Sequence, residues 1–259
     1  MRRRASRPQL KRDSLGRREY VDSRVVNREL RAAVRPVLRA HGFSVFTERT
    51  AWRHTPGRID VVNFQSFNDY LATAVGVTTF SFALNLGQYL RCVPPDDFAI
   101  KLRGGLLAPK EWECHLRLLP QRRLEQPELA RRDIWFIDPA GTYLEAAVRD
   151  VRKVILDVGL AWFDRYADDH ELLRALLEVE TDAPDGTALG GNLGSPARNL
   201  LLGYLCLSLG RRKEALEPLA AALARKLQIS ASLASKRSKY RPPQWDRLAR
   251  DVALLKLGV

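Results

Sequence analysis

The stretch from Arg58 to Leu90 constrains the fold more than any other part of the sequence. Between positions 80 and 86, large apolar side chains alternate with small or polar ones: Phe80, Phe82, Leu84 and Leu86 against Ser81, Ala83 and Asn85. A period of two residues is typical of a β-strand with one buried face. The run Ile59–Gln65 follows the turn residues Thr55-Pro56-Gly57 and is rich in β-branched residues. Together these patterns predict neighbouring antiparallel strands.

A helix is predicted before the strands. Apolar residues recur every three or four positions from Val25 to Leu38, which predicts an amphipathic helix. Gly42 supplies the left-handed residue at which helices often end. Pro36 lies inside this pattern, so a kink or an early break near Val34 is expected.

The remaining patterns define the fold class. A further strand is predicted over Trp112–Leu118, and Asp133–Asp138 is predicted to be an edge strand or an extended link. The stripe Leu144–Val158 predicts a helix, and Thr142 and Glu145 have the spacing of a capping box at its start. We therefore predict an α+β fold: an antiparallel sheet of about four to six strands covered by helices, with a C-terminal helical extension.

Composition divides the chain into four parts. Residues 1–22 are predicted to be a disordered basic tail, because they contain little apolar surface to bury. Residues 23–180 are predicted to form the α+β domain, and the Gly-rich residues 181–195 a flexible linker. Residues 196–259 are predicted to be helical and to include a hairpin similar to a single tetratricopeptide repeat. The residues that carry this likeness are Gly203, Gly210, Ala215 and Ala222.

Cysteine spacing and hydropathy exclude several classes of protein. Cys92, Cys114 and Cys206 have no paired spacing, so neither a disulfide framework nor a zinc site is indicated. Each is predicted to be a buried apolar residue rather than a reactive thiol. No apolar run approaches the roughly 18 residues of a membrane-spanning helix, and the basic start lacks the apolar centre of a secretory signal. These features predict a cytoplasmic protein that uses no cofactor and contacts no membrane.

The net charge of +13 is concentrated at the two ends of the chain. Residues 1–40 carry 13 Lys and Arg against 4 Asp and Glu, and residues 225–250 carry 8 against 1. Residues 41–224 carry 21 against 24. Basic termini of this kind are compatible with sequence-independent binding of nucleic acid. Solvated tails explain the same charges, and we favour them at the sequence level.

Several short segments together carry a resemblance to a known family. They are Gly42-Phe43, Val62–Gln65, Phe82–Gly87, Glu113–His115 with Arg117, and Asp133 with Trp135. In this order they resemble an uncharacterised bacterial family, known only as a domain of unknown function, over roughly residues 25 to 165. Ile134 and Phe136 flank Trp135 where a tryptophan pair is expected. The resemblance supports the fold and implies no activity.

Amide side chains on the predicted sheet form the first candidate site. Asn63 and Gln65 are two positions apart on one strand, and Asn85 lies on the polar face of its neighbour. We predict that the three residues form a ligand-binding surface for a peptide edge or a small polar ligand. The alternative is that they only meet water or satisfy loop backbone groups.

A second candidate site comes from alternating polar residues. Glu111, Glu113 and His115 fall on one side of a strand if the predicted strand includes them. Carboxylate and imidazole ligands can hold a divalent metal ion, so the pattern raises the alternative of a metal-dependent hydrolase. A half-buried strand gives the same pattern without metal, and we therefore predict no metal site. The sequence favours a non-enzymatic binding or interaction module with a protein partner.

Overall fold

The computed structural model describes residues 21–95, 100–179, 183, 185–234 and 243–258. The predicted tail, residues 1–22, falls outside these ranges except for its last two residues. The chain divides into two compact units. The first contains residues up to 51 together with 63–85 and 119–160, and the second contains 52–62, 86–118 and 161–259. The two longest strands therefore contribute residues to both units.

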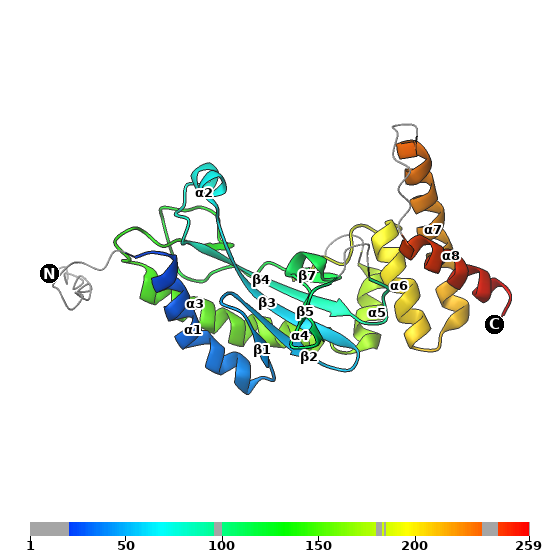
Figure 1. Cartoon of the computed structure of the whole chain (residues 1–259), viewed down its shortest axis with the longest axis horizontal. Coiled ribbons are helices and arrows are strands. Elements are labelled where there is room, and N and C mark those ends of the chain that lie inside the picture. The colour runs from blue at the N-terminus through cyan, green and yellow to red at the C-terminus, as the bar shows by residue number, and fades with distance from the viewer. Residues whose placement is uncertain (1–20, 96–99, 180–182, 184, 235–242, 259) are drawn as a thin grey trace. The chain divides into compact units, whose positions relative to one another are not determined.

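An antiparallel sheet is the main element of the fold (Figure 1). Its strands are β1 (Val45–Phe46), β2 (Thr50–His54), β3 (Arg58–Ser66), β4 (Phe82–Leu90), β7 (Leu116–Leu118) and β8 (Ile134–Trp135). The order is β1-β2-β3-β4-β7, and β8 also pairs with β4. Both of the last two strands run antiparallel to β4. The predicted α+β class with its antiparallel sheet is confirmed.

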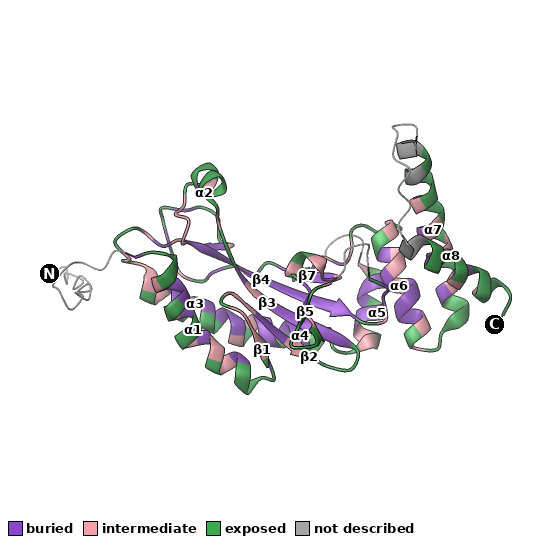
Figure 2. Cartoon of the chain, viewed as in Figure 1, coloured by how far each residue is buried: buried purple, intermediate pink, exposed green. Residues whose placement is uncertain are grey.

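Strand β4 is more deeply buried than its alternating pattern predicts. All nine of its residues are buried, whereas the pattern indicated one open face (Figure 2). At Gly87 the second face is covered by Cys114: an added Cβ at Gly87 would be 2.7 Å from the Cys114 Sγ. The ring of Tyr89 packs on His115, with 4.7 Å between centroids. The small size of Gly87 thus makes room for the segment that contains Cys114 and His115.

The predicted strand over Trp112–Leu118 is wrong in its first half. Residues Glu111–Glu113 form a 3₁₀ helix, η1, and β7 begins only at Leu116. The Lys110 N–H donates to the Glu113 carboxylate at 2.7 Å, which fixes the turn at its start. Trp112 consequently remains 49% exposed instead of packing beneath the sheet.

In the first unit, α1 (Ser23–Ala40) lies beside α3 (Leu144–Val154), as Figure 1 shows. The Asp22 carboxylate caps α1 by accepting hydrogen bonds from two backbone N–H groups. The helix continues through Pro36, and Gly42 follows it with φ 85° as predicted. A short helix, α2 (Asp69–Val75), precedes β4.

The start and end of α3 differ from the sequence prediction. Thr142 does not cap the helix: its hydroxyl donates to Asp138, whose carboxylate also accepts from the Tyr143 N–H. The helical path also continues beyond the predicted stripe Leu144–Val158, because a π-helical turn, Ile155–Gly159, leads directly into α4 (Leu160–Arg165). A π-helical turn is closed by an i→i+5 hydrogen bond and so contains one residue more than an α-helical turn, and the chain stays helical through it.

The second unit contains the C-terminal helices and a small hairpin. The helices are α5 (Asp169–Glu178), α6 (Pro196–Ser208), α7 (Arg212–Ala234) and α8 (Pro243–Lys256), and the hairpin is β5 (Leu102–Arg103) with β6 (Leu106–Leu107). Helices α6 and α7 form a hairpin in which Gly203 leaves room for Leu219. Its likeness to a tetratricopeptide repeat stays a prediction.

A buried arginine holds the end of α5. Arg198 is 1% exposed and donates to the carbonyl oxygens of Ala175, Leu176 and Val179. These carbonyls lie at the C-terminal end of α5, where a helix runs out of backbone N–H partners and the helix dipole favours a cation. In the predicted linker, the described residues also make specific contacts: Ala188 forms a bridge with Arg117, and Thr187 accepts a hydrogen bond from the Trp162 indole. The linker itself remains a prediction.

Candidate functional site

The candidate amide residues are held in two cross-strand pairs. The Asn85 side chain on β4 donates to the Gln65 Oε1 on β3 at 2.8 Å. The Asn63 side chain, two residues earlier on β3, donates to the Thr50 hydroxyl on β2 at 2.9 Å. Because residues two apart in a strand share a face, Asn63 and Gln65 lie on the same face of β3. The structure therefore arranges four polar side chains as a row, Thr50, Asn63, Gln65 and Asn85, which we call the amide row.

Burial changes along the amide row. Asn85 is 5% exposed, Asn63 and Thr50 are half-buried, and Gln65 is exposed. A primary amide carries two N–H donors and an acceptor oxygen. The bond from Asn85 fixes the Gln65 oxygen and leaves the two Gln65 N–H donors at an exposed position. The row thus presents an oriented amide to solvent.

The other polar cluster on β3 and β4 is buried. Asp60 is 1% exposed, and its carboxylate accepts from the Gln88 amide at 2.9 Å and from the Arg53 guanidinium at 2.7 Å. Gln88 also donates to the Phe163 carbonyl at 3.0 Å. We call Arg53, Asp60 and Gln88 the buried polar cluster.

The electrostatics of Asp60 reflect this burial. Removal from water raises the pKa of the Asp60 carboxyl above its ordinary value, and the neighbouring Arg53 acts in the opposite direction. Burial is the larger effect. The Gln88 Oε1 is also buried without a hydrogen-bond partner among the described residues. The cluster connects the sheet to the residues around Phe163 and has no exposed carboxylate to offer a ligand.

The alternative metal site, with Glu111, Glu113 and His115 on one side of a strand, does not form, because Glu111–Glu113 are a 3₁₀ helix. Glu113 accepts the Lys110 N–H in η1, and the His115 Nδ1 accepts the Leu90 N–H at 2.9 Å. Glu113 therefore holds the start of η1 and His115 holds the end of β4, instead of lining one side of a strand. Within the described ranges, no three His, Cys, Asp or Glu side chains are grouped to hold a metal ion.

The cysteines are placed in different surroundings. Cys114 and Cys206 are buried, and Cys92 is half-buried. Burial raises the pKa of the Cys114 thiol well above its usual range, so this thiol is protonated near neutral pH. A protonated, buried thiol is a poor nucleophile.

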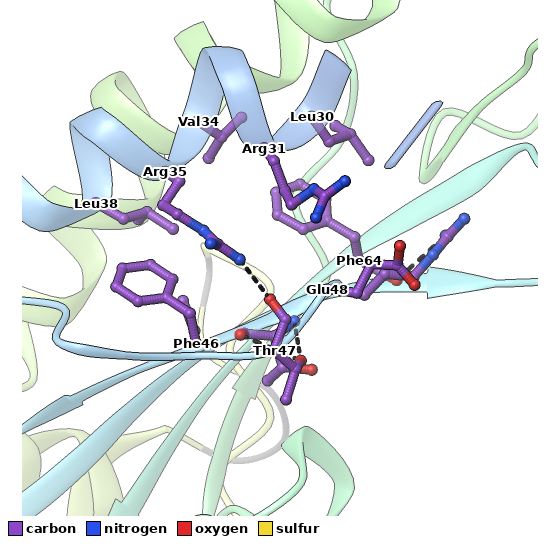
Figure 3. Close-up of a pocket in the computed structure, with 12 residues that line it drawn as sticks. Leu30, Arg31, Val34, Arg35, Leu38, Phe46, Thr47, Glu48 and Phe64 are labelled. Atoms are coloured by element: carbon purple, nitrogen blue, oxygen red, sulfur yellow. Dashed lines mark hydrogen bonds between the residues drawn. The ribbon is translucent and has the colours of Figure 1, made fainter. Parts of the chain in front are cut away.

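A shallow groove runs between α1 and the β1–β2 hairpin (Figure 3). Its floor is apolar, with Leu30, Val34 and Phe64, and its rim carries charged side chains such as Arg31 and Glu48. The enclosed volume is only ≈ 20 Å³, which is room for about one water molecule. Asn63, Gln65 and Asn85 do not line it. The groove is too small to enclose a substrate.

Comparison with known proteins identifies the family. A family model described as a domain of unknown function, DUF4304, matches residues 34–165, which is half of the chain. The chain belongs to the DUF4304 family. No curated protein and no solved structure matches it. The match covers α1 from Val34 onward, the whole antiparallel sheet, α3 and α4.

Most of the residues considered above belong to the DUF4304 region. The amide row and the buried polar cluster both fall within it. Sequence reasoning found the amide row but missed the buried polar cluster. The available signal was Asp60, a carboxylate between Ile59 and Val61 in an otherwise apolar strand. A charged residue at such a position is rarely buried without a partner.

In the described part of the chain, no helix is long and apolar enough to cross a membrane.

Proposed function

We propose that this DUF4304 protein is a non-enzymatic interaction module of the cytoplasm that binds an extended segment of a protein partner along the amide row. The observation that carries the proposal is the exposed Gln65 amide, held in orientation by Asn85. A fixed amide matches the alternating donors and acceptors of a peptide backbone. Asn63, anchored on Thr50, adds a second amide on the same face.

A peptide fits this surface better than a small molecule does. Small ligands are usually bound in cavities of about 300–1,000 Å³ that cover most of their surface. The amide row lies on a sheet face and outside the groove beside α1. An extended segment needs only a row of oriented polar groups and its own length of contact.

The alternative of a metal-dependent hydrolase is not proposed. It required Glu111, Glu113 and His115 on one side of a strand, and Glu111–Glu113 form a 3₁₀ helix. The Glu113 carboxylate and the His115 imidazole each accept a hydrogen bond from a backbone N–H group.

Selection from a random peptide display library tests the proposal. The full chain serves as bait, and enriched peptides are titrated against the wild type and the Gln65→Ala variant by fluorescence anisotropy. We expect Gln65→Ala to weaken binding at least tenfold, which corresponds to about 1.4 kcal/mol.

A matched control tests whether the loss of peptide affinity is specific to Gln65 or follows the removal of any exposed glutamine. Gln228 is exposed on α7, where its side chain accepts from Arg225 at 2.8 Å. Gln228→Ala should leave peptide affinity unchanged. Failure to enrich any peptide, or equal loss in both variants, would contradict the proposal.

A further inference from the structure

Five arginines lie on one face of α1. They are Arg24, Arg28, Arg31, Arg35 and Arg39, separated by steps of four, three, four and four residues. At 3.6 residues per turn these positions fall within a sector of about 80°, over a length of about 22 Å. We call this surface the arginine face. The buried residues of α1, among them Leu30, Val34 and Leu38, occupy a different side of the helix.

The two C-terminal arginines of this face also have a packing role. Arg35 and Arg39 lie over the Phe46 ring, at 5.0 and 5.4 Å from its centroid. Arg35 also donates to the Thr47 carbonyl at 2.8 Å, as Figure 3 shows. These contacts hold α1 against β1 and fix the direction of the face.

The three N-terminal arginines are exposed, and helix stability does not account for them. Arg24 lies in the first turn, where the helix dipole disfavours a cation, and this turn contains no acidic residue. Arg28 makes an ion pair with its neighbour Glu29 at 3.0 Å, with both side chains largely exposed. Such a pair contributes little to stability. Arg31 is exposed at the rim of the groove.

The three acidic groups near the face in the described part of the chain do not balance its five arginines. Asp22 is used as the N-cap of α1, Glu29 is paired with Arg28, and Glu48 lies across the groove on the β1–β2 turn. Glu48 is accompanied by Arg49 on the same turn. The sequence preceding the helix adds further positive charge, since residues 1–20 contain 8 Lys and Arg against 2 Asp and Glu.

We propose that the arginine face of α1 binds the phosphate backbone of a nucleic-acid duplex without reading its sequence. Guanidinium groups match phosphate oxygens with paired N–H donors. A duplex presents one negative charge per about 1.7 Å along its axis, so a straight row of cations about 22 Å long meets phosphates along its whole length. This site is separate from the amide row and independent of the function proposed for it.

A duplex is favoured over an acidic protein segment by the shape of the surface. Protein interfaces depend on a few anchoring side chains that fill pockets. The groove beside the arginine face encloses only ≈ 20 Å³ and cannot accept such an anchor. Phosphate binding requires no pocket, only spaced charges.

Fluorescence anisotropy with a labelled mixed-sequence DNA duplex of about 20 base pairs tests the proposal over a salt series from about 50 to about 200 mM. The full chain is compared with the triple variant Arg24→Gln, Arg28→Gln, Arg31→Gln, which leaves the Phe46 contacts in place. We expect the variant to bind at least tenfold more weakly. The slope of log K against log salt should also fall in magnitude by about 2–3.

An equal-charge control uses exposed arginines away from this face: Arg149→Gln on α3, Arg174→Gln on α5 and Arg211→Gln in the turn before α7. Circular dichroism confirms that both triple variants remain folded. The control should retain affinity within about twofold. The proposal is overturned if the full chain does not bind the duplex at low salt, or if both variants lose affinity equally. It is also overturned if poly-glutamate binds the arginine face and the duplex does not.

Discussion

The two polar clusters on β3 and β4 contain similar chemical groups in opposite environments. Asp60 and Gln88 are buried: the Gln88 amide donates to the Asp60 carboxylate and to the Phe163 carbonyl. Gln65 and Asn85 also bond to each other, but Gln65 is exposed. The side chains of Asp60 and Gln88 are needed to hold the fold, because water cannot replace a lost hydrogen-bond partner at a buried position. The exposed Gln65 amide can exchange water for a ligand, while the buried Asn85 holds it in place.

This comparison separates positions whose substitution costs stability from positions whose substitution costs binding. A buried charge that loses its partner destabilises a protein strongly. An exposed amide that loses its side chain changes stability little. The predictions below follow this difference, from the largest expected effect to the smallest.

Replacing Arg53 should have the largest effect on stability. Arg53→Met leaves the Asp60 carboxylate buried with only the Gln88 amide as a side-chain partner. We expect the free energy of unfolding to fall by about 3–5 kcal/mol, measured by urea denaturation. Arg149→Met removes a largely exposed ion pair with Glu145 and should cost no more than about 0.5 kcal/mol. Equal losses in the two variants would mean that the buried polar cluster does not support the fold.

Filling the space beside Gly87 should have the next largest effect. In Gly87→Ala the new Cβ would lie 2.7 Å from the Cys114 Sγ and 2.8 Å from its Cβ, so the covering segment must move. We expect a loss of about 1–3 kcal/mol by the same assay. At Gly57 an added Cβ meets nothing within 4 Å, and φ is not in the left-handed range, so Gly57→Ala is the control. If Gly87→Ala is as stable as Gly57→Ala, the second face of β4 is not closed at this point.

The pH dependence of stability should reveal the buried carboxyl. Because the pKa of Asp60 is raised in the folded protein, its protonated form is favoured by folding. The wild type should therefore lose stability relative to Asp60→Asn as pH rises from the ordinary value near 3.8 toward neutrality. Urea titrations of both proteins from about pH 4 to about pH 7 measure the difference. A difference that changes in the opposite direction would show that the ion pair with Arg53 outweighs burial.

Substitution of Gln65 should have the smallest effect on stability. Gln65→Ala removes an exposed side chain, and we expect a change of less than about 0.5 kcal/mol. The same variant should lose peptide affinity, as proposed above. A loss of stability comparable to that of Gly87→Ala would assign Gln65 to the folded core.

Local periodicity was sufficient to predict the antiparallel sheet as a class and the amphipathic helix α1. Alternation in Phe80–Leu86 and the stripe in α1 are properties of single elements, and both patterns correspond to elements of the structure. What covers a face is a tertiary property. The small and polar residues Ser81, Ala83 and Asn85 indicate an open face in the sequence, yet all three are buried. On the same strand, the small size of Gly87 allows close packing by Cys114.

The candidate sites show the same limit. Alternating Glu111, Glu113 and His115 satisfy a strand pattern, but Glu111 and Glu113 lie in a turn fixed by the Lys110 N–H. The pairing of Asn85 with Gln65 depends on strand register, which the separate segments do not specify. The buried position of Asp60 depends on Arg53 and Gln88, which lie on other strands.

The most direct measurement of the central claim is a comparison of side-chain amide signals by NMR. A peptide enriched in the display selection is added to the 15N-labelled full chain, and the NH₂ signals of Asn63, Gln65 and Asn85 are followed together with that of Gln88. We predict shifts of the first three signals on binding, while the Gln88 signal stays in place. Shifts at Gln88 without shifts at Gln65 and Asn85 would contradict the assignment of the amide row as the binding surface.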